Sequence, residues 1–130
     1  MRPDIFKEWI QKADEDFEFA VASLECGAYY AQICFHFQQA AEKYLKAFII
    51  ANQLNFRPVH NLLELLLICG KKEPKIKEIE ENCQYLNAFY IDTRYPVHWP
   101  TDYDQKTALQ AKDAAERIKK WIKLRLREEK

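Results

Sequence analysis

Arg94 and His98 are the two residues of this sequence whose types and spacing could perform chemistry together, because three residues separate them. Histidine transfers protons near neutral pH, and arginine presents a planar fork of donors that fits phosphate oxygens. RNA is cleaved by its own 2′-hydroxyl when one group removes the hydroxyl proton and another stabilises the charged phosphorane. The pair therefore indicates phosphate binding, or cleavage of RNA without a metal ion.

Each residue of the pair also has a structural interpretation. Arg94 could instead neutralise the carbonyl end of the helix that precedes it, and His98 could pack inside a loop rich in aromatic residues. Pro96 prevents a regular helix from carrying both side chains on one face. The irregular segment over residues 94–101 would therefore have to bring the guanidinium and the imidazole together.

Two lysines form a second candidate site. Lys43 follows Gln39 by four residues and precedes Lys46 by three, so the three side chains share one polar stripe of a predicted helix. Such a stripe could hold one ligand phosphate, and the alternative is a solvated helix face. The candidate nucleotide- or RNA-binding residues are thus Arg94, Tyr95, His98, Lys43 and Lys46.

The sequence offers little for other chemistries. The 4 cysteines form no Cys-x-x-Cys pair and no zinc-like spacing with the 3 histidines. Asp14 and Asp16 are two residues apart on a predicted helix, so they point to different sides and do not form a metal site. A Gly-rich phosphate loop and a Ser-His-Asp pattern are missing. We expect no metal, no cofactor, and the reduced thiols of a cytoplasmic protein.

The elements that must position these residues are helices. Only 2 glycines occur, fewer than a sheet with many tight turns requires, while apolar residues recur at steps of three and four. His60 is expected to cap or brace a short, almost wholly apolar helix, which should be buried, in part against a second subunit. His36 is expected to be structural or to lie at a helix interface. The predicted helices cover about 4–25, 30–53, 61–69 and 74–93, with a last one capped by Thr101 or Asp102. One all-α domain over residues 1–130 follows.

Charge is balanced overall but uneven along the chain, with 20 basic and 20 acidic residues. Residues 1–25 are mainly acidic, and residues 117–130 are mainly basic. The basic helix could meet phosphate or the acidic face of another chain, and the alternative is a solvated face with cations near the helix end. The N-terminal segment has no uninterrupted apolar stretch, so we expect neither a signal peptide nor a membrane span.

Two stretches resemble the HEPN family. The segment over residues 34–47 carries the paired glutamines, Ala-Glu-Lys and Leu-Lys-Ala of the family's second helix, and residues 86–96 carry Leu-Asn, Tyr, and Thr-Arg-Tyr-Pro. His60-Asn61-Leu62 stands where the family often has His-Asp-Leu. The resemblance implies an up-and-down bundle of four long helices plus one short helix, a homodimer, and a minimal nucleotidyltransferase as partner.

In several such pairs, the HEPN protein is a toxin that cleaves RNA without metal, and the nucleotidyltransferase silences it. The family motif has four to six residues between its arginine and its histidine, whereas three separate Arg94 from His98, and Pro100 stands where some members carry a modified tyrosine. Three hypotheses follow from the resemblance: a nucleotide- or RNA-binding protein acting with a nucleotidyltransferase, a metal-independent endoribonuclease using Arg94 and His98, and a non-catalytic helical interaction module.

Overall fold

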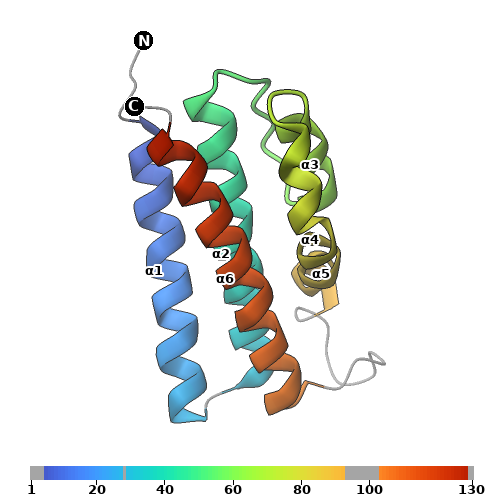
Figure 1. The fold of residues 1–130 in the computed structure, drawn as a ribbon. Helices are drawn as coiled ribbons and strands as arrows, with labels where there is room; N and C mark the ends of the chain where they lie inside the picture. The colour runs from blue at the N-terminus through green and yellow to red at the C-terminus, as the bar shows by residue number, and fades with distance from the viewer. Residues whose placement is uncertain (1–4, 28, 93–102, 129–130) are drawn as a thin grey trace.

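The computed structural model describes residues 5–27, 29–92 and 103–128, and these residues form a helical bundle (Figure 1). No strand occurs within these three ranges, so the all-α prediction is confirmed. Three of the helices are long and the others are short. The elements are α1 (Ile5–Cys26), α2 (Tyr30–Ala51), α3 (Leu62–Gly70), the 3₁₀ helix η1 (Pro74–Ile79), α4 (Glu80–Asn87), α5 (Phe89–Asp92) and α6 (Gln105–Glu128).

Helix α2 is the centre of the bundle. It contacts α1, α3, α4, α5 and α6, and 13 of its 22 residues are buried. Figure 1 shows α1 and α2 running in opposite directions, with α6 beside both and the α3–α4 layer on the other side. Small residues on α2 and α6 allow the helices to approach closely, and Ala40, Ala41, Ala108 and Ala111 are all 0% exposed. The buried apolar side chains form one cluster.

Gly27 ends α1, as its position in the sequence predicts. Its φ is +72°, in the left-handed region that glycine adopts without the steric cost of a Cβ. Helix α1 buries one stripe, at Ala13, Phe17, Ala20 and Leu24, and these positions are spaced by three and four residues. The predicted N-cap of this helix, Asp4, lies outside the described residues.

The predicted fourth helix consists of three consecutive helical segments, η1, α4 and α5. Pro74 has no amide hydrogen and stands in the first turn, where the Glu73 side chain accepts a hydrogen bond from the amide of Lys75 at 3.3 Å. The first segment, η1, is a 3₁₀ helix rather than an α-helix. The inward positions continue at helical spacing through all three segments, which is why the sequence pattern predicts a single helix. They are Ile76, Ile79, Cys83, Leu86 and Phe89.

Helix α6 begins later than the sequence indicates. Thr101 and Asp102 lie outside the described residues, and the first described cap is Asp104, whose Oδ1 accepts hydrogen bonds from Thr107 N at 2.9 Å and Thr107 Oγ1 at 2.8 Å. An aspartate that accepts amide hydrogens at a helix start is stabilised as the carboxylate. These hydrogen bonds from Thr107 hold the pKa of Asp104 below its ordinary value of 3.8.

We expect Asp104 to make the stability of the chain sensitive to acid. A carboxyl group with a lowered pKa in the folded state stabilises that state above its unfolded pKa, and the effect disappears as the pH falls through the folded pKa. Thermal unfolding should therefore show a steeper loss of stability for the wild type than for Asp104→Asn as the pH falls from about 5 to about 2. Asparagine caps helices without titrating, so equal slopes for the two proteins would contradict the prediction.

Helix α3 is capped by Asn61. Its side-chain oxygen accepts hydrogen bonds from Leu63 N at 2.9 Å and Glu64 N at 3.2 Å. The Asn87 side chain at the end of α4 accepts a further hydrogen bond, from Leu62 N at 2.7 Å. Within this single chain, α3 is not buried all round: Leu67 is 73% exposed and lines an open groove of about 620 Å³ between α3 and η1. The expected burial of part of this helix against a second subunit stays a prediction.

The basic residues of α6 contact groups of their own chain. Lys123 Nζ lies 3.0 Å from Asp14 Oδ2 on α1, Lys119 Nζ lies 4.4 Å from the centre of the Phe17 ring, and Arg117 donates to the carbonyl of Glu78. Part of the positive charge of the last helix is thus neutralised by the acidic first helix, through the ion pair of Lys123 with Asp14. Neither sequence interpretation of the basic helix, as a partner-binding face or as a solvated face, describes these residues fully.

Three of the cysteines are packed into the core. Cys34, Cys69 and Cys83 are 0% exposed, and only Cys26 is at the surface. Burial raises the pKa of the Cys34 thiol and that of the Cys83 thiol to about 12. These thiols are therefore small apolar groups, as the sequence indicates for Cys34 and Cys83, rather than nucleophiles. Within the described ranges, no helix is both long enough and apolar enough to span a bilayer.

Candidate functional site

The structure describes part of the predicted site. Arg94, Tyr95 and His98 lie outside the described residues, which end at Asp92 in α5 and resume at Tyr103. The elements that precede them in the chain are α4 and α5, and Tyr90 of α5 lies beside His60, just before α3. The candidate site is therefore built from the described residues around this contact, and from the two lysines of α2.

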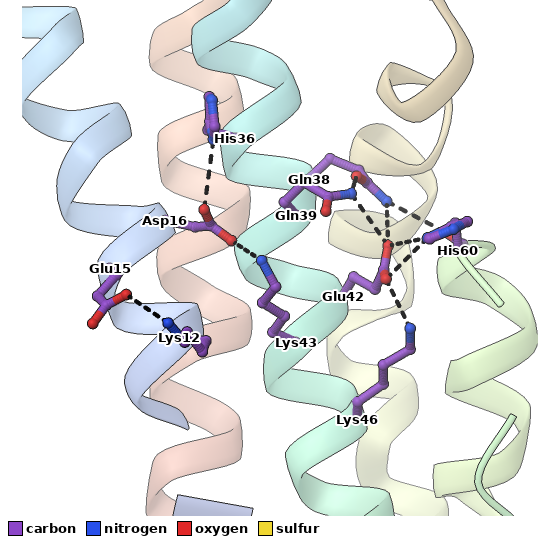
Figure 2. A network of polar contacts seen from close by, with 10 residues as sticks. All are labelled: Lys12, Glu15, Asp16, His36, Gln38, Gln39, Glu42, Lys43, Lys46 and His60. Atoms are coloured by element: carbon purple, nitrogen blue, oxygen red, sulfur yellow. Dashed lines mark hydrogen bonds and ion pairs between the residues drawn. The ribbon is translucent and has the colours of Figure 1, made fainter. Parts of the chain in front are cut away.

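Lys43 and Lys46 do not share a solvated stripe. Lys43 forms an ion pair with Asp16 on α1, and its side chain is 27% exposed. Lys46 is only 5% exposed, and its Nζ lies 2.8 Å from a carboxylate oxygen of Glu42. Figure 2 shows the two ammonium groups turned toward different carboxylates. The alternative of a solvated helix face is wrong for Lys46, and a phosphate that reached either lysine would compete with an existing carboxylate.

Lys46 also lies beside two aromatic rings. Its Nζ is 5.7 Å from the centre of the Trp9 ring and 5.8 Å from the centre of the Phe56 ring. Aromatic faces attract cations, and they attract them more strongly where water is excluded. The ammonium group is therefore held between the Glu42 carboxylate and an aromatic wall formed by α1 and the segment that follows α2.

Glu42 is the centre of a buried polar group that we call the Glu42 cluster, formed by Gln38, Gln39, Glu42, Lys46 and His60 (Figure 2). Its carboxylate is 3% exposed and accepts from Gln38 Nε2 at 3.5 Å, Gln39 Nε2 at 3.3 Å and Lys46 Nζ at 2.8 Å. These three donors stand four residues before, three before and four after Glu42, so helix geometry brings them together. A buried carboxylate is tolerated only with such donors.

His60 joins the Glu42 cluster from the segment before α3. Its Nδ1 lies 3.2 Å from Oε1 and 3.1 Å from Oε2 of Glu42, and its carbonyl accepts a hydrogen bond from Gln38 Nε2 at 3.3 Å. The ring stacks on Tyr90 of α5, with centroids 4.3 Å apart and planes 14° apart. The sequence predicts that His60 either caps or braces α3. Because the cap of α3 is Asn61, His60 has the bracing role.

The stacked pair of His60 and Tyr90 reaches the surface. The His60 side chain is 48% exposed, although its Nδ1 faces a buried carboxylate. The Tyr90 ring also lies near Phe35 of α2, with ring centroids 6.1 Å apart. Exposed aromatic and imidazole rings are surfaces on which unpaired nucleobases stack, and imidazole nitrogens can contact phosphate. This arrangement is chemically suited to a nucleotide or a single-stranded RNA.

A second polar group is structural. Asp14 accepts a hydrogen bond from the hydroxyl of Tyr44 and pairs with Lys123, so that α1, α2 and α6 meet at one carboxylate. Burial, and then the hydrogen bond to Asp14, raise the pKa of Tyr44. Asp16 instead faces Lys43 and His36, with 3.5 Å between its Oδ1 and His36 Nδ1. His36 thus lies at the α1–α2 interface, as predicted, and the described residues hold no group of three metal ligands.

Sequence reasoning missed Glu42 and Tyr90 as site residues. The signal for Glu42 was present, since polar residues at 38, 39, 42 and 46 recur at steps of three and four on a helix that is otherwise largely apolar. Tyr90 gave no such signal, because an aromatic residue at helical spacing is usually part of the core. Its contact with His60 joins positions 30 residues apart, which local spacing does not reveal.

Comparison with known proteins gives a consistent assignment. Residues 6–126 match the family model of the HEPN domain. The structure resembles that of TT1696 from Thermus thermophilus, with a TM-score of 0.82 and 30% identity over 91% of this chain and 95% of that one. It also resembles ST0689, an archaeal HEPN homologue, with a TM-score of 0.77 and 27% identity over 93% and 97% of the two chains. No curated protein matches the chain.

Proposed function

Because this chain belongs to the HEPN domain family, we propose that it binds nucleotide or RNA, forms a homodimer and acts with a minimal nucleotidyltransferase. In this proposal the ligand contacts Arg94, Tyr95 and His98, together with the surface of His60 and Tyr90. The phosphate-binding role considered for Lys43 and Lys46 is left out, because each already pairs with a carboxylate.

The observation that supports the proposal most directly is the half-exposed His60 ring, which stacks on the partly buried Tyr90. The stack is anchored to the buried Glu42 carboxylate, so the ring is held in place before a ligand arrives, which reduces the entropy lost on binding. Tyr90 precedes Arg94 by four residues, so the stack belongs to the same stretch of sequence as the Arg–His pair. Arginine forks and aromatic rings are the groups that single-stranded RNA sites combine.

We expect Arg94→Ala to weaken binding of a fluorescein-labelled single-stranded RNA by about 10–100-fold, the effect of losing charge-assisted hydrogen bonds to a phosphate. Fluorescence anisotropy measures the affinity. Arg127→Ala removes an exposed arginine from α6 and is the matched control, with little expected change. Equal affinities of the wild type and Arg94→Ala would remove Arg94 from the site, and no RNA binding by the wild type would contradict the proposed function.

Two further readouts separate the remaining hypotheses. Cleavage of the same RNA by the wild type in the presence of a chelator, lost in both Arg94→Ala and His98→Ala, would extend the function to that of an endoribonuclease. Co-purification with a nucleotidyltransferase encoded beside this protein tests the partner, and failure of the two purified proteins to associate would argue against it. If the protein neither cleaves RNA nor associates with a nucleotidyltransferase, the hypothesis that remains is a non-catalytic helical interaction module.

A further inference from the structure

Helix α3 keeps one side outside the core of its own chain. It contacts α2, η1 and α4, and Figure 1 shows it on the side of the bundle opposite to α1. Leu67 on its outer side is 73% exposed and lines the open groove of about 620 Å³ between α3 and η1, which we call the α3–η1 groove. A single exposed leucine is ordinary, but a leucine at the edge of a large apolar groove is typical of a contact surface.

The lining of the α3–η1 groove is mainly apolar. It includes Leu66, Ile68 and Ile76, which are 8% exposed or less, together with Pro74 at the start of η1. Gly70 also lines the groove, and because glycine has no side chain, another chain can approach the backbone of α3 closely there. The groove is therefore suited to receive an apolar side chain from outside.

The charged residues that line the groove carry both signs. The bases are Arg57, Lys71 and Lys77, and the acids are Glu64 and Glu80. RNA is held mainly through positive charge, so the two acids disfavour it here. In a twofold dimer one patch meets its own copy, so the patch must supply both members of every ion pair. The two signs therefore favour a second copy of this chain as the occupant.

The order of residues on the outer side of α3 is complementary to itself. Glu64, Leu67 and Lys71 follow one another at steps of three and four, and the backbone of Lys71 is still helical, so the three share one face. Along the helix axis, Glu64 stands about 4.5 Å before Leu67 and Lys71 about 6 Å after it. Two copies of α3 packed antiparallel about Leu67 therefore place each acid opposite a base. Parallel packing would oppose like charges, which is costly.

We propose that the α3–η1 groove is the dimer interface of this protein, in which α3 packs antiparallel to α3 of a second copy about a twofold axis at Leu67. The inference rests on the homodimer of the proposed function and names the surface that forms it. Each Leu67 side chain is withdrawn from water against the groove of the other copy, and this burial drives the association. A twofold contact is closed, so it yields a dimer and not a filament.

The ion pairs at this interface set its register. Arg57 pairs with Oε2 of Glu64 at 2.9 Å, which leaves Oε1 of the same carboxylate to accept from Lys71 of the second copy. Exposed ion pairs contribute little to affinity, but like charges in their place are repelled. The charges therefore select the antiparallel arrangement, while Leu67 and the apolar lining of the groove supply most of the affinity.

Leu67→Glu tests the interface, because two carboxylates would meet at the twofold axis. Sedimentation equilibrium over a dilution series measures the Kd of the dimer, which should rise by about 100-fold or more. Circular dichroism should show an unchanged fold, since Leu67 is mostly exposed within one chain. Leu124→Glu is the matched control. Leu124 is a 50% exposed leucine of α6 that lines a different groove, so this variant should keep the wild-type Kd.

Mixing two charge variants tests the antiparallel register. Lys71→Glu alone should raise the Kd by about tenfold, because two acids then face each other at both ends of the contact, and Glu64→Lys alone should do the same with two bases. An equal mixture of the two variants should form a heterodimer with about the wild-type Kd, because each acid again faces a base. A defect in the folding of either variant could not be repaired by mixing.

The outcomes separate this inference from the proposed homodimer. If the wild type is a dimer and Leu67→Glu keeps its Kd, or if Leu124→Glu is the variant that dissociates, the α3–η1 interface is overturned and the homodimer stands. If the mixture stays as weak as the single variants, the antiparallel register is overturned. A wild type that is monomeric throughout the dilution series overturns both the homodimer and this interface, and RNA binding is judged separately by fluorescence anisotropy.

Discussion

Glu42→Leu should reduce the free energy of unfolding by about 3–5 kcal/mol, the usual cost of removing one partner from a buried ion pair. The Lys46 ammonium group is 5% exposed and would remain buried without its carboxylate. The side chains of Gln38 and Gln39 would each lose an acceptor as well, and His60 would lose the group that orients its ring. Urea unfolding monitored by circular dichroism measures the free energy of unfolding of both proteins.

The double variant Glu42→Leu with Lys46→Met tests the cause. Removing both charges leaves no uncompensated ion in the core, and apolar replacements of buried ion pairs are often close to neutral in stability. The double variant should therefore recover most of the stability that Glu42→Leu loses. A double variant as unstable as the single one would show that shape or the lost hydrogen bonds, rather than the unpaired charge of Lys46, dominate the effect.

Phe37→Ala should destabilise the chain by about 3–5 kcal/mol, through the lost transfer of the ring from water and the cavity that remains. Phe37 is 0% exposed at the centre of α2, and its ring packs against the edge of Phe17 on α1 with centroids 5.5 Å apart. The long helices on both sides cannot shift far enough to fill the space. Thermal and urea unfolding should both show the loss.

Phe19→Ala is the matched control for the core substitution. Phe19 belongs to α1 and is 55% exposed, and its ring contacts His36 at the surface. Removing it should change the stability by about 0.5–1 kcal/mol at most, because little of the ring is withdrawn from water. Similar losses for the two variants would contradict the description of α2 as the centre of the core.

The helices were predictable because apolar residues recur at a period that only a helix satisfies. Local signals also placed some ends correctly, such as Gly27 after α1. The division of the segment over residues 74–92 into η1, α4 and α5 was not predictable in this way, because Ile76, Ile79, Cys83 and Leu86 keep one face through all three segments. Backbone hydrogen bonding can change from i+3 to i+4 without altering that pattern.

The candidate site was predicted less well than the fold. The sequence places Lys46 on a polar stripe, as a phosphate contact or as part of a solvated face, because its charge is visible there. Its burial depends on Trp9 and Phe56, which are remote in the chain. Asn61 rather than His60 caps α3, although the two residues are neighbours and both are polar. Sequence spacing identifies groups that share one helix, whereas contacts between elements, such as that of His60 with Tyr90, require the fold.

The position of α6 against α2 has a consequence for how the protein is made. Five residues of α6 that face the core are 0% exposed, namely Ala108, Ala111, Ala115, Ile118 and Ile122. When the ribosome has produced α1 to α5, the side of α2 that these residues cover is still open. At about 5–20 residues per second, the 36 residues from the end of α5 at Asp92 to the end of α6 at Glu128 take a further 2–7 s or so to synthesise. During that interval the nascent chain exposes an apolar face suited to chaperone binding.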